Sequence, residues 1–200
     1  MRTRLIYSKR GGACFVPHVA LSAIFARAAL RANLKLSMTQ GFSPRAKISF
    51  APELPAGVIA LNEPVEIFFD ETVPDNVIEI LNNAMPEGFI MKNILFPDEN
   101  SISLGKICSS ALYLIKSKFI NAHDLDALLR EHYKNEIFKS DFDSDLDNDW
   151  LMLYIKNPAQ NGIGSFVKKI ISQNIINGWH QINIVRHSIG LWNGKDICLS

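Results

Sequence analysis

The chain has 200 residues, of which 48% are hydrophobic, and it carries 21 basic and 20 acidic side chains. A chain of this size and composition can bury a core, which excludes intrinsic disorder as its main state. It has no apolar run approaching the ~20 residues of a membrane-spanning helix and no recognisable secretory signal, so we expect a cytoplasmic protein that contacts no membrane.

The metal-binding residue types form no recognised site pattern. Cys14, Cys108 and Cys198 are far apart and odd in number, which argues against disulfides, a zinc-binding pair and a cysteine-held iron–sulfur cluster. The alternating aspartates from Asp141 to Asp149 lack the glycine and glutamate that a calcium-binding EF-hand loop needs. We therefore expect no metal and no cofactor.

The charges are divided unevenly along the chain. Residues 1–52, here called the basic segment, contain nine Lys and Arg and no Asp or Glu, whereas the rest of the chain carries all 20 carboxylates against 12 basic side chains. The nine are Arg2, Arg4, Lys9, Arg10, Arg27, Arg31, Lys35, Arg45 and Lys47. A surface of this kind favours an anionic partner such as RNA, with ordinary solvated charges as the alternative.

In the first half, extended segments are predicted over residues 4–8, 34–39, 47–50, 65–70 and 89–96. One helix is predicted over residues 18–33, where Leu21, Ile24, Phe25 and Ala28 share a stripe, and Arg27 and Arg31 lie one turn apart on its flank. Pro74 is well placed for the first turn of a second helix.

The second half repeats this order after a polar stretch that resembles a linker. Strands are predicted over residues 111–118, 136–139, 150–156 and 181–192, with helices capped by Asn121 and Ser165. Two successive βαββαβ runs predict an α+β protein of two tandem ferredoxin-like domains, residues 1–97 and 106–200. A single mixed domain is the competing interpretation.

One loop in the basic segment concentrates features that an ordinary hairpin does not need together. The candidate binding residues there are Gln40, Gly41, Phe42, Ser43, Pro44, Arg45 and Lys47. The glycine allows positive φ or close approach, the proline stiffens the turn, and two cations flank an aromatic ring. Phe42 is suited to stack on a base, and its alternative role is to fill the core beneath the turn.

A second candidate lies between the first strand and the first helix. Lys9, Arg10, Gly11 and Gly12 form a basic glycine turn that can meet an anion, although P-loop spacing is absent. His18, at the expected start of the helix, is suited to contact phosphate or to act as an acid or base, with a structural role as the alternative. Because the basic segment has no carboxylate, an acidic partner for His18 has to come from elsewhere, such as Glu53 or Glu63.

Several short motifs occur in the order found in the radical SAM-linked protein family, which the chain resembles over roughly its first half. The matching residues are Phe15, His18, Arg27, Arg31, Gly41, Phe42, Pro44, Ser49, Phe50, Ala51, Leu54, Gly57 and Glu63. The chain departs from the family where Pro17-His18-Val19-Ala20 replaces Ser-His-Leu-Asp and where Ala46 replaces a proline. The resemblance implies partnership with a radical SAM enzyme in modifying tRNA or ribosomal RNA.

Three functions follow as hypotheses. The first is a non-catalytic RNA-binding or substrate-presenting partner of a radical SAM enzyme, in which the basic segment holds phosphates. The second is a metal-independent endoribonuclease with His18 as general base and Arg27, Arg31 or Arg45 steadying the phosphate. The third is a protein-only adaptor of the radical SAM enzyme. Because no carboxylate lies near His18 in sequence, we rank binding above catalysis.

Overall fold

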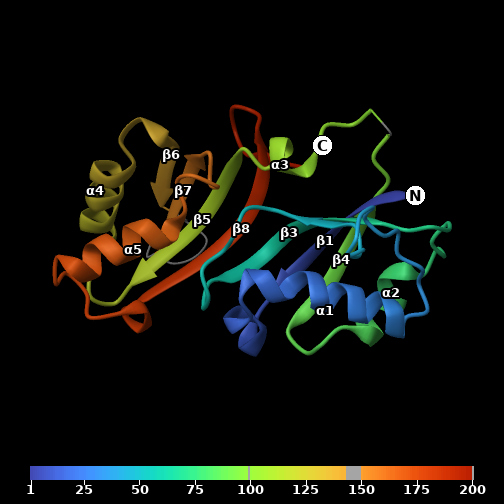
Figure 1. Cartoon of the computed structure of the whole chain (residues 1–200). Helices are drawn as coiled ribbons and strands as arrows, with labels where there is room; N and C mark the ends of the chain where they lie inside the picture. The colour runs from blue at the N-terminus through green and yellow to red at the C-terminus, as the bar shows by residue number, and fades with distance from the viewer. Residues whose placement is uncertain (99, 143–149, 200) are drawn as a thin grey trace.

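The computed structural model describes residues 1–98, 100–142 and 150–199, so most of the aspartate run, from Asp143 to Asp149, lies outside the described residues (Figure 1). The strands are β1 (Arg2–Lys9), β2 (Ile48–Phe50), β3 (Ile59–Phe68), β4 (Phe89–Leu95), β5 (Ser110–Ser117), β6 (Ile137–Phe142), β7 (Leu151–Lys156), β8 (Ile182–Trp192) and β9 (Ile197–Cys198). The helices are α1 (His18–Arg31), α2 (Val77–Ala84), α3 (Leu104–Ile107), α4 (Ala122–Tyr133) and α5 (Ile163–Ser172), and a 3-10 turn, η1 (Gly11–Phe15), precedes α1.

The described strands join one open sheet of nine strands, in the order β4-β1-β3-β8-β5-β7-β6, with β2 on β3 and β9 on β8. The halves of the chain meet where β3 and β8 run parallel, with Ile59 opposite Val185 and Ala60 opposite Arg186. The α+β class is therefore confirmed. Two separate ferredoxin-like domains are not, because the strands of both halves belong to the same sheet.

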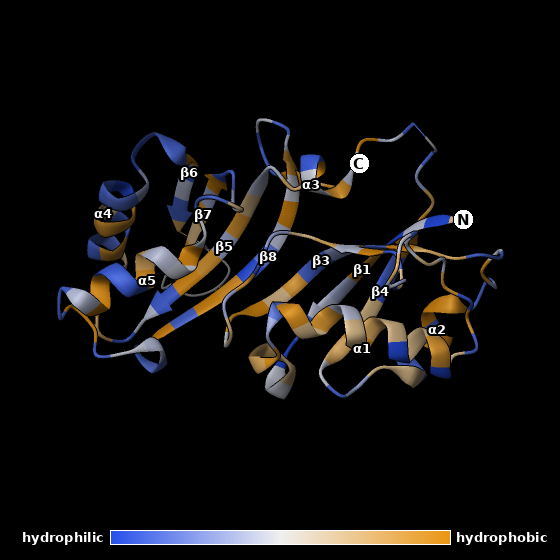
Figure 2. Ribbon diagram, in the orientation of Figure 1, coloured by the Kyte–Doolittle hydropathy of each residue, from blue (hydrophilic) through white to orange (hydrophobic). Residues whose placement is uncertain are grey.

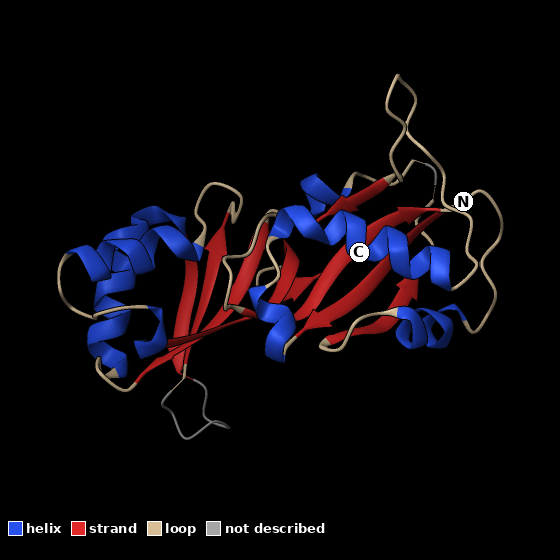
Figure 3. Ribbon diagram, turned by 60° about the horizontal axis from the view of Figure 1, so that its bottom comes forward, coloured by secondary structure: helices blue, strands red, loops and turns tan. Residues whose placement is uncertain are grey.

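The longer helices pack against one side of this sheet, α1 and α2 over the first half and α4 and α5 over the second (Figure 3). Orange and blue segments alternate along β8 in Figure 2, the pattern of a strand with one buried face. The predicted apolar stripe of α1 is confirmed, since Leu21, Phe25 and Ala28 are buried. Ala51, Leu54 and Ala60, from the first half, belong to the core of the second half, so the halves share apolar contacts.

Several predicted features differ from the structure. Residues 34–39 form isolated bridges and no strand, and Pro74 lies before α2, which starts at Val77. β3 starts at Ile59, earlier than expected, because the second half supplies the β8 edge on which it begins. Ser165 is not the cap of α5, which starts after Gly162. The expected linker carries α3, and its Ser101 and Ile102 carbonyls accept hydrogen bonds from Arg2, so it is tied to β1.

In the described part of the chain, no helix combines the length and the apolar character needed to cross a bilayer.

Gly88 offers a test of the packing at the turn before β4. Its φ is +87°, and an added Cβ would lie 2.5 Å from the carbonyl oxygen of Arg10. Gly88→Ala should therefore lower the free energy of unfolding by at least ~1–3 kcal/mol, measured by urea denaturation. Gly105→Ala is the matched control, because a Cβ at Gly105 meets nothing within 4 Å. Equal midpoints for the two variants would contradict this packing.

Candidate functional site

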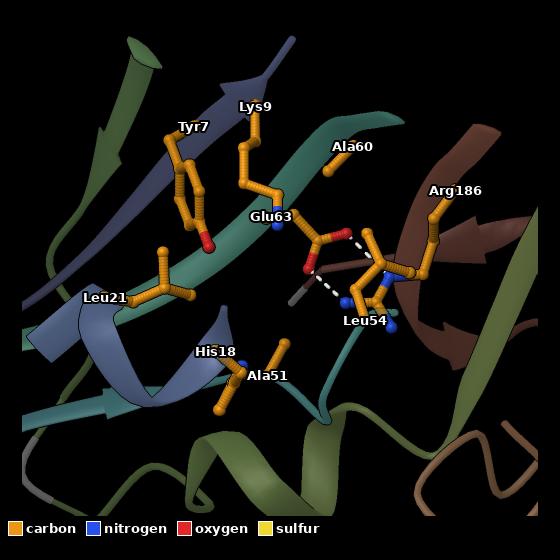
Figure 4. A pocket seen from close by; sticks show the side chains of 9 residues that line it. All are labelled: Tyr7, Lys9, His18, Leu21, Ala51, Leu54, Ala60, Glu63 and Arg186. Carbon is orange, nitrogen blue, oxygen red and sulfur yellow. Dashed lines mark hydrogen bonds and ion pairs between the residues drawn. The ribbon is translucent and has the colours of Figure 1, made fainter. Parts of the chain in front are cut away.

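A small polar cavity lies beneath the start of α1, where β1, β3 and β8 come together (Figure 4). It is lined by Tyr7, Lys9, His18, Leu21, Ala51, Leu54, Ala60, Glu63 and Arg186. A β-bulge between β1 and β3 shifts the register, so that Tyr7 faces Glu63 and Lys9 faces Ala60. Positions three apart on a regular strand point to opposite faces, and the extra bulged residue allows both Ala60 and Glu63 to line the cavity.

The centre of this cavity is a buried ion pair between the two halves of the chain. Arg186 donates from Nε to Glu63 Oε1 at 2.7 Å and from Nη2 to Glu63 Oε2 at 2.5 Å, and it also reaches the Pro52 carbonyl at 2.9 Å. The two residues are 1% and 3% exposed. Burial alone would lower the pKa of the Arg186 guanidinium, but the Glu63 carboxylate outweighs burial and the pKa is raised. Arg186 is therefore a fixed cation.

Lys9 and Tyr7 enter the cavity from β1 and are nearly enclosed. The Lys9 ammonium donates to the Val16 carbonyl at 3.3 Å, and burial lowers its pKa, an effect that nearby Cys14 and Glu63 oppose. Burial also raises the pKa of the Tyr7 phenol. Lys9 was expected in a surface anion site, and this placement is corrected: its side chain is only 3% exposed because the strand turns it toward Glu63.

His18 is the first residue of α1 and is half-buried at the same cavity. Its ring packs edge-to-face on Phe50, with 5.9 Å between ring centroids. Burial lowers the pKa of His18, and Glu53 partly opposes this. The two carboxylates suggested as partners from the sequence are thus the ones near the ring: Glu63 lines the same cavity and Glu53 acts on its charge.

The cavity has a volume of about 10 Å³, which is room for roughly one water molecule. An RNA phosphate cannot enter it in this conformation. Arg27 also lies nine residues along α1 from His18, a rise of about 13.5 Å. The helix therefore does not bring Arg27 or Arg31, which lies a further turn along α1, to the proposed general base. Among the described residues, no group of His, Cys, Asp and Glu side chains could hold a metal ion.

The loop from Gln40 to Lys47 is exposed and held at its base. Met38 and Ala46 form an antiparallel bridge, and the Arg45 amide donates to the Thr39 hydroxyl at 3.0 Å. The Lys47 ammonium lies 4.0 Å from the centroid of the Phe68 ring, a cation–π contact. The exposed loop residues are Gln40, Gly41, Phe42, Ser43, Pro44, Arg45 and Lys47.

Phe42 in this loop is fully exposed. The alternative that its ring fills the core beneath the turn is therefore wrong, because no part of the ring is covered. The whole ring is therefore accessible to a partner that approaches the loop.

The remaining candidate residues lie at the surface. Arg10, Gly11, Gly12, Arg27 and Arg31 are exposed. Arg31 is engaged, since it donates from Nε to the Ala84 carbonyl at the end of α2 at 3.1 Å. Gly11 has a φ of +55°, the left-handed conformation that its lack of a side chain allows.

Part of the charge asymmetry has an internal cause. Arg2 and Arg4 each lie 2.8 Å from the Glu66 carboxylate, and Lys35 pairs with Glu71. The carboxylates absent from the basic segment are thus supplied by β3 and the residues that follow it. The surface cations of the segment are fewer than its composition indicates.

Sequence reasoning missed Tyr7 and Arg186 as members of the cavity. Arg186 is 123 residues from Glu63, and no local motif marks a pairing over such a separation. Tyr7 follows Leu5 and Ile6 in β1, so the sequence pattern does not distinguish it from a core residue of the strand. An acidic residue inside a largely apolar strand, as Glu63 and Glu66 are in β3, was the available signal that a buried cation would be found opposite it.

Comparison with protein families identifies the family of the chain. The family described as an uncharacterized protein conserved in bacteria (DUF2344) matches residues 2–146, well over half of the chain. No curated protein matches the sequence.

The ion pair gives a first test of the site. Arg186→Met leaves the Glu63 carboxylate buried without its partner and should lower the free energy of unfolding by about 3–5 kcal/mol. Lys35→Met, which breaks the exposed Lys35–Glu71 pair, is the matched control and should leave the urea midpoint nearly unchanged. The double variant Glu63→Gln/Arg186→Met should regain part of the loss. Equal midpoints for the Arg186 and Lys35 variants would contradict the role of the buried pair.

The lowered pKa of His18 predicts a pH dependence of stability. The unfolded chain protonates near the ordinary value of 6.5 while the folded ring stays neutral, so the unfolded state binds more protons and stability falls as pH falls below about 6.5. His18→Asn should reduce this fall, measured as melting temperature between pH 7.5 and 5. His123→Asn, at an exposed position, is the control. If the melting temperature of the His18 variant falls with pH as steeply as that of the wild type, another group causes the pH dependence of stability.

Proposed function

We propose that this chain, which belongs to the DUF2344 family, is an RNA-binding accessory protein that presents RNA to a radical SAM enzyme. The observation that carries the RNA part is the fully exposed Phe42 in a loop that also exposes Arg45 and Lys47. Stacking of a base on an aromatic ring contributes about 1–3 kcal/mol, and adjacent cations neutralise the phosphates of the same strand.

The construction of the loop supports this use. Its base is tied by the Met38–Ala46 bridge, and Lys47 is placed by its contact with Phe68. An anchored loop loses less conformational entropy on binding than a free one. No carboxylate lies within the loop sequence, so the approaching phosphates meet no local repulsion.

The partner enzyme is proposed from the resemblance to the radical SAM-linked protein family, on the motif residues that include Phe15, Gly41 and Glu63. We further infer that each half is a ferredoxin-like unit. The support is the matching order of neighbouring strands, β4-β1-β3-β2 in the first half and β8-β5-β7-β6 in the second. Joined side by side, such units leave one long sheet with helices on a single side.

A protein-only adaptor is the second candidate function, favoured by the outer surface of α1. Val19 and Leu30 are 85% and 78% exposed there, although both are apolar. Such residues are suited to a protein partner. Co-purification with a radical SAM enzyme after nuclease treatment, without any RNA binding by the isolated chain, would favour the adaptor.

The RNA proposal is tested at Phe42. Phe42→Ala should weaken binding of total cellular RNA about tenfold, from the loss of one stacking contact, measured by filter binding at two salt concentrations. Arg45→Ala should weaken binding. It should also make the plot of log K against log salt less steep, by the amount that corresponds to the loss of about one phosphate contact. Phe119→Ala, which removes an exposed ring outside the loop, is the control. Absence of RNA binding by the wild type at low salt would refute the proposal.

A further inference from the structure

A much larger groove than the polar cavity lies where β3 and β8 begin. Its volume is about 730 Å³, within the roughly 300–1,000 Å³ range of small-ligand sites. It is lined by Phe15, Ala56, Gly57, Val58, Ile59, Trp150, Trp179, His180, Ile182, Asn183, Ile184 and Val185. Both halves of the chain therefore contribute to its walls.

Aromatic rings from distant parts of the sequence converge on this groove. Phe15 comes from η1, Trp150 precedes β7, and Trp179 and His180 precede β8. Several rings elsewhere pack in pairs, as Phe138 does on Trp192 at 5.0 Å between centroids. Among the described residues, none of the groove's rings makes such a ring contact, although Trp179 also packs against the core of the second half. No other aromatic ring therefore competes with a planar ligand for these rings.

Phe15 is held in an exposed position by the backbone beside it. It is 72% exposed, and its Cε1 would lie 3.6 Å from a Cβ built on Gly57. Gly57 has a φ of +90°, and its amide donates to the Cys14 carbonyl at 2.9 Å, which ties the two segments together. The ring therefore stands at the mouth of the groove on a fixed support.

The groove also offers hydrogen-bonding groups. Residues 182–184 of β8 pair with β5 along one edge, whereas pairing with β3 on the other edge begins only at Val185. Within the part of the chain that the structure describes, this short edge has no strand partner. The Ile182 amide already donates to the Trp179 carbonyl, and the remaining backbone groups that face this edge can read the edge of a base, as peptide groups do in nucleic-acid recognition.

The charge of the lining indicates which part of a nucleotide would enter. Among the described lining residues there is no Asp, Glu, Lys or Arg, so these walls suit a neutral, planar group better than a phosphate. The cation nearest in sequence, Arg186, follows the lining residue Val185 but is engaged by Glu63. The described lining residues themselves thus offer no Lys or Arg to a phosphate.

We propose that this groove binds an unstacked nucleobase of the RNA, sandwiched between Phe15 and the tryptophans. The proposal rests on the RNA-binding function and adds to it a second contact, made by both halves of the chain. The loop at Phe42 holds the strand by stacking and charge, and the groove takes up one base.

Intrinsic fluorescence tests the groove separately from the loop. The chain has three tryptophans, two of which line the groove, so a bound base should quench the emission. Titration with adenosine, guanosine, cytidine and uridine, which carry no phosphate, should give saturable quenching by at least one of them. Phe15→Ala should raise the dissociation constant about tenfold, and Trp179→Leu should remove most of the quenching. Phe42→Ala and Trp192→Phe are controls that should retain the quenching by nucleosides. The melting temperature of each variant shows whether it is folded.

The outcomes distinguish the two proposals. Salt-dependent RNA binding without quenching by any nucleoside overturns the groove and leaves the RNA function standing. Quenching that persists unchanged in both Phe15→Ala and Trp179→Leu also overturns the groove as the base site. Nucleoside quenching without RNA binding at low salt overturns the proposed function, and with it the assignment of the groove to RNA. The inference is supported if Phe15→Ala and Trp179→Leu lose the nucleoside response while the Phe42→Ala and Trp192→Phe controls keep it.

Discussion

The buried pair of Glu63 and Arg186 is the interaction on which the rest of the structure depends. Two charges removed from water are tolerated only when each satisfies the other, and here the guanidinium meets both carboxylate oxygens and a backbone carbonyl. One partner lies on β3 and the other on β8, beside the short parallel pairing that joins the halves of the sheet. A small displacement of either strand would leave an unpaired charge in the core. The pair therefore holds both the register and the relative position of the halves.

This constraint also explains how the charges of the chain are used. β3 carries Glu63 and Glu66, and both carboxylates are turned inward to cations, Glu63 to Arg186 and Glu66 to Arg2 and Arg4. Arg2 and Arg4 belong to the basic segment, so part of the segment's charge stabilises the sheet. What remains at the surface is Arg10, the flank of α1 and the loop around Phe42. A functional interpretation of the segment has to rest on these positions and not on its net charge.

The two proposed contacts with RNA differ in their physical character. The loop offers an exposed ring with cations, a combination that grips a strand with little dependence on sequence. The groove offers aromatic rings and a strand edge without a strand partner, and its described lining carries no Lys, Arg, Asp or Glu, which suits a base. It lies where β8 begins before its pairing with β3. A protein that holds a strand and takes up one of its bases fits the role of presenting RNA to a modifying enzyme.

Local pattern in the sequence was enough to determine most of the succession of strands and helices, the buried stripe of α1 and the loop from Gln40 to Lys47. Periodicity, glycines and prolines act over a few residues, so these features can be read without knowing the fold. Only the tertiary structure decided that both halves share one sheet, that Lys9 is buried, and that Phe15 and Trp179 line the same groove. Each of these depends on pairing between residues far apart in the chain, above all Glu63 with Arg186, and no local pattern encodes which distant strand a strand will join.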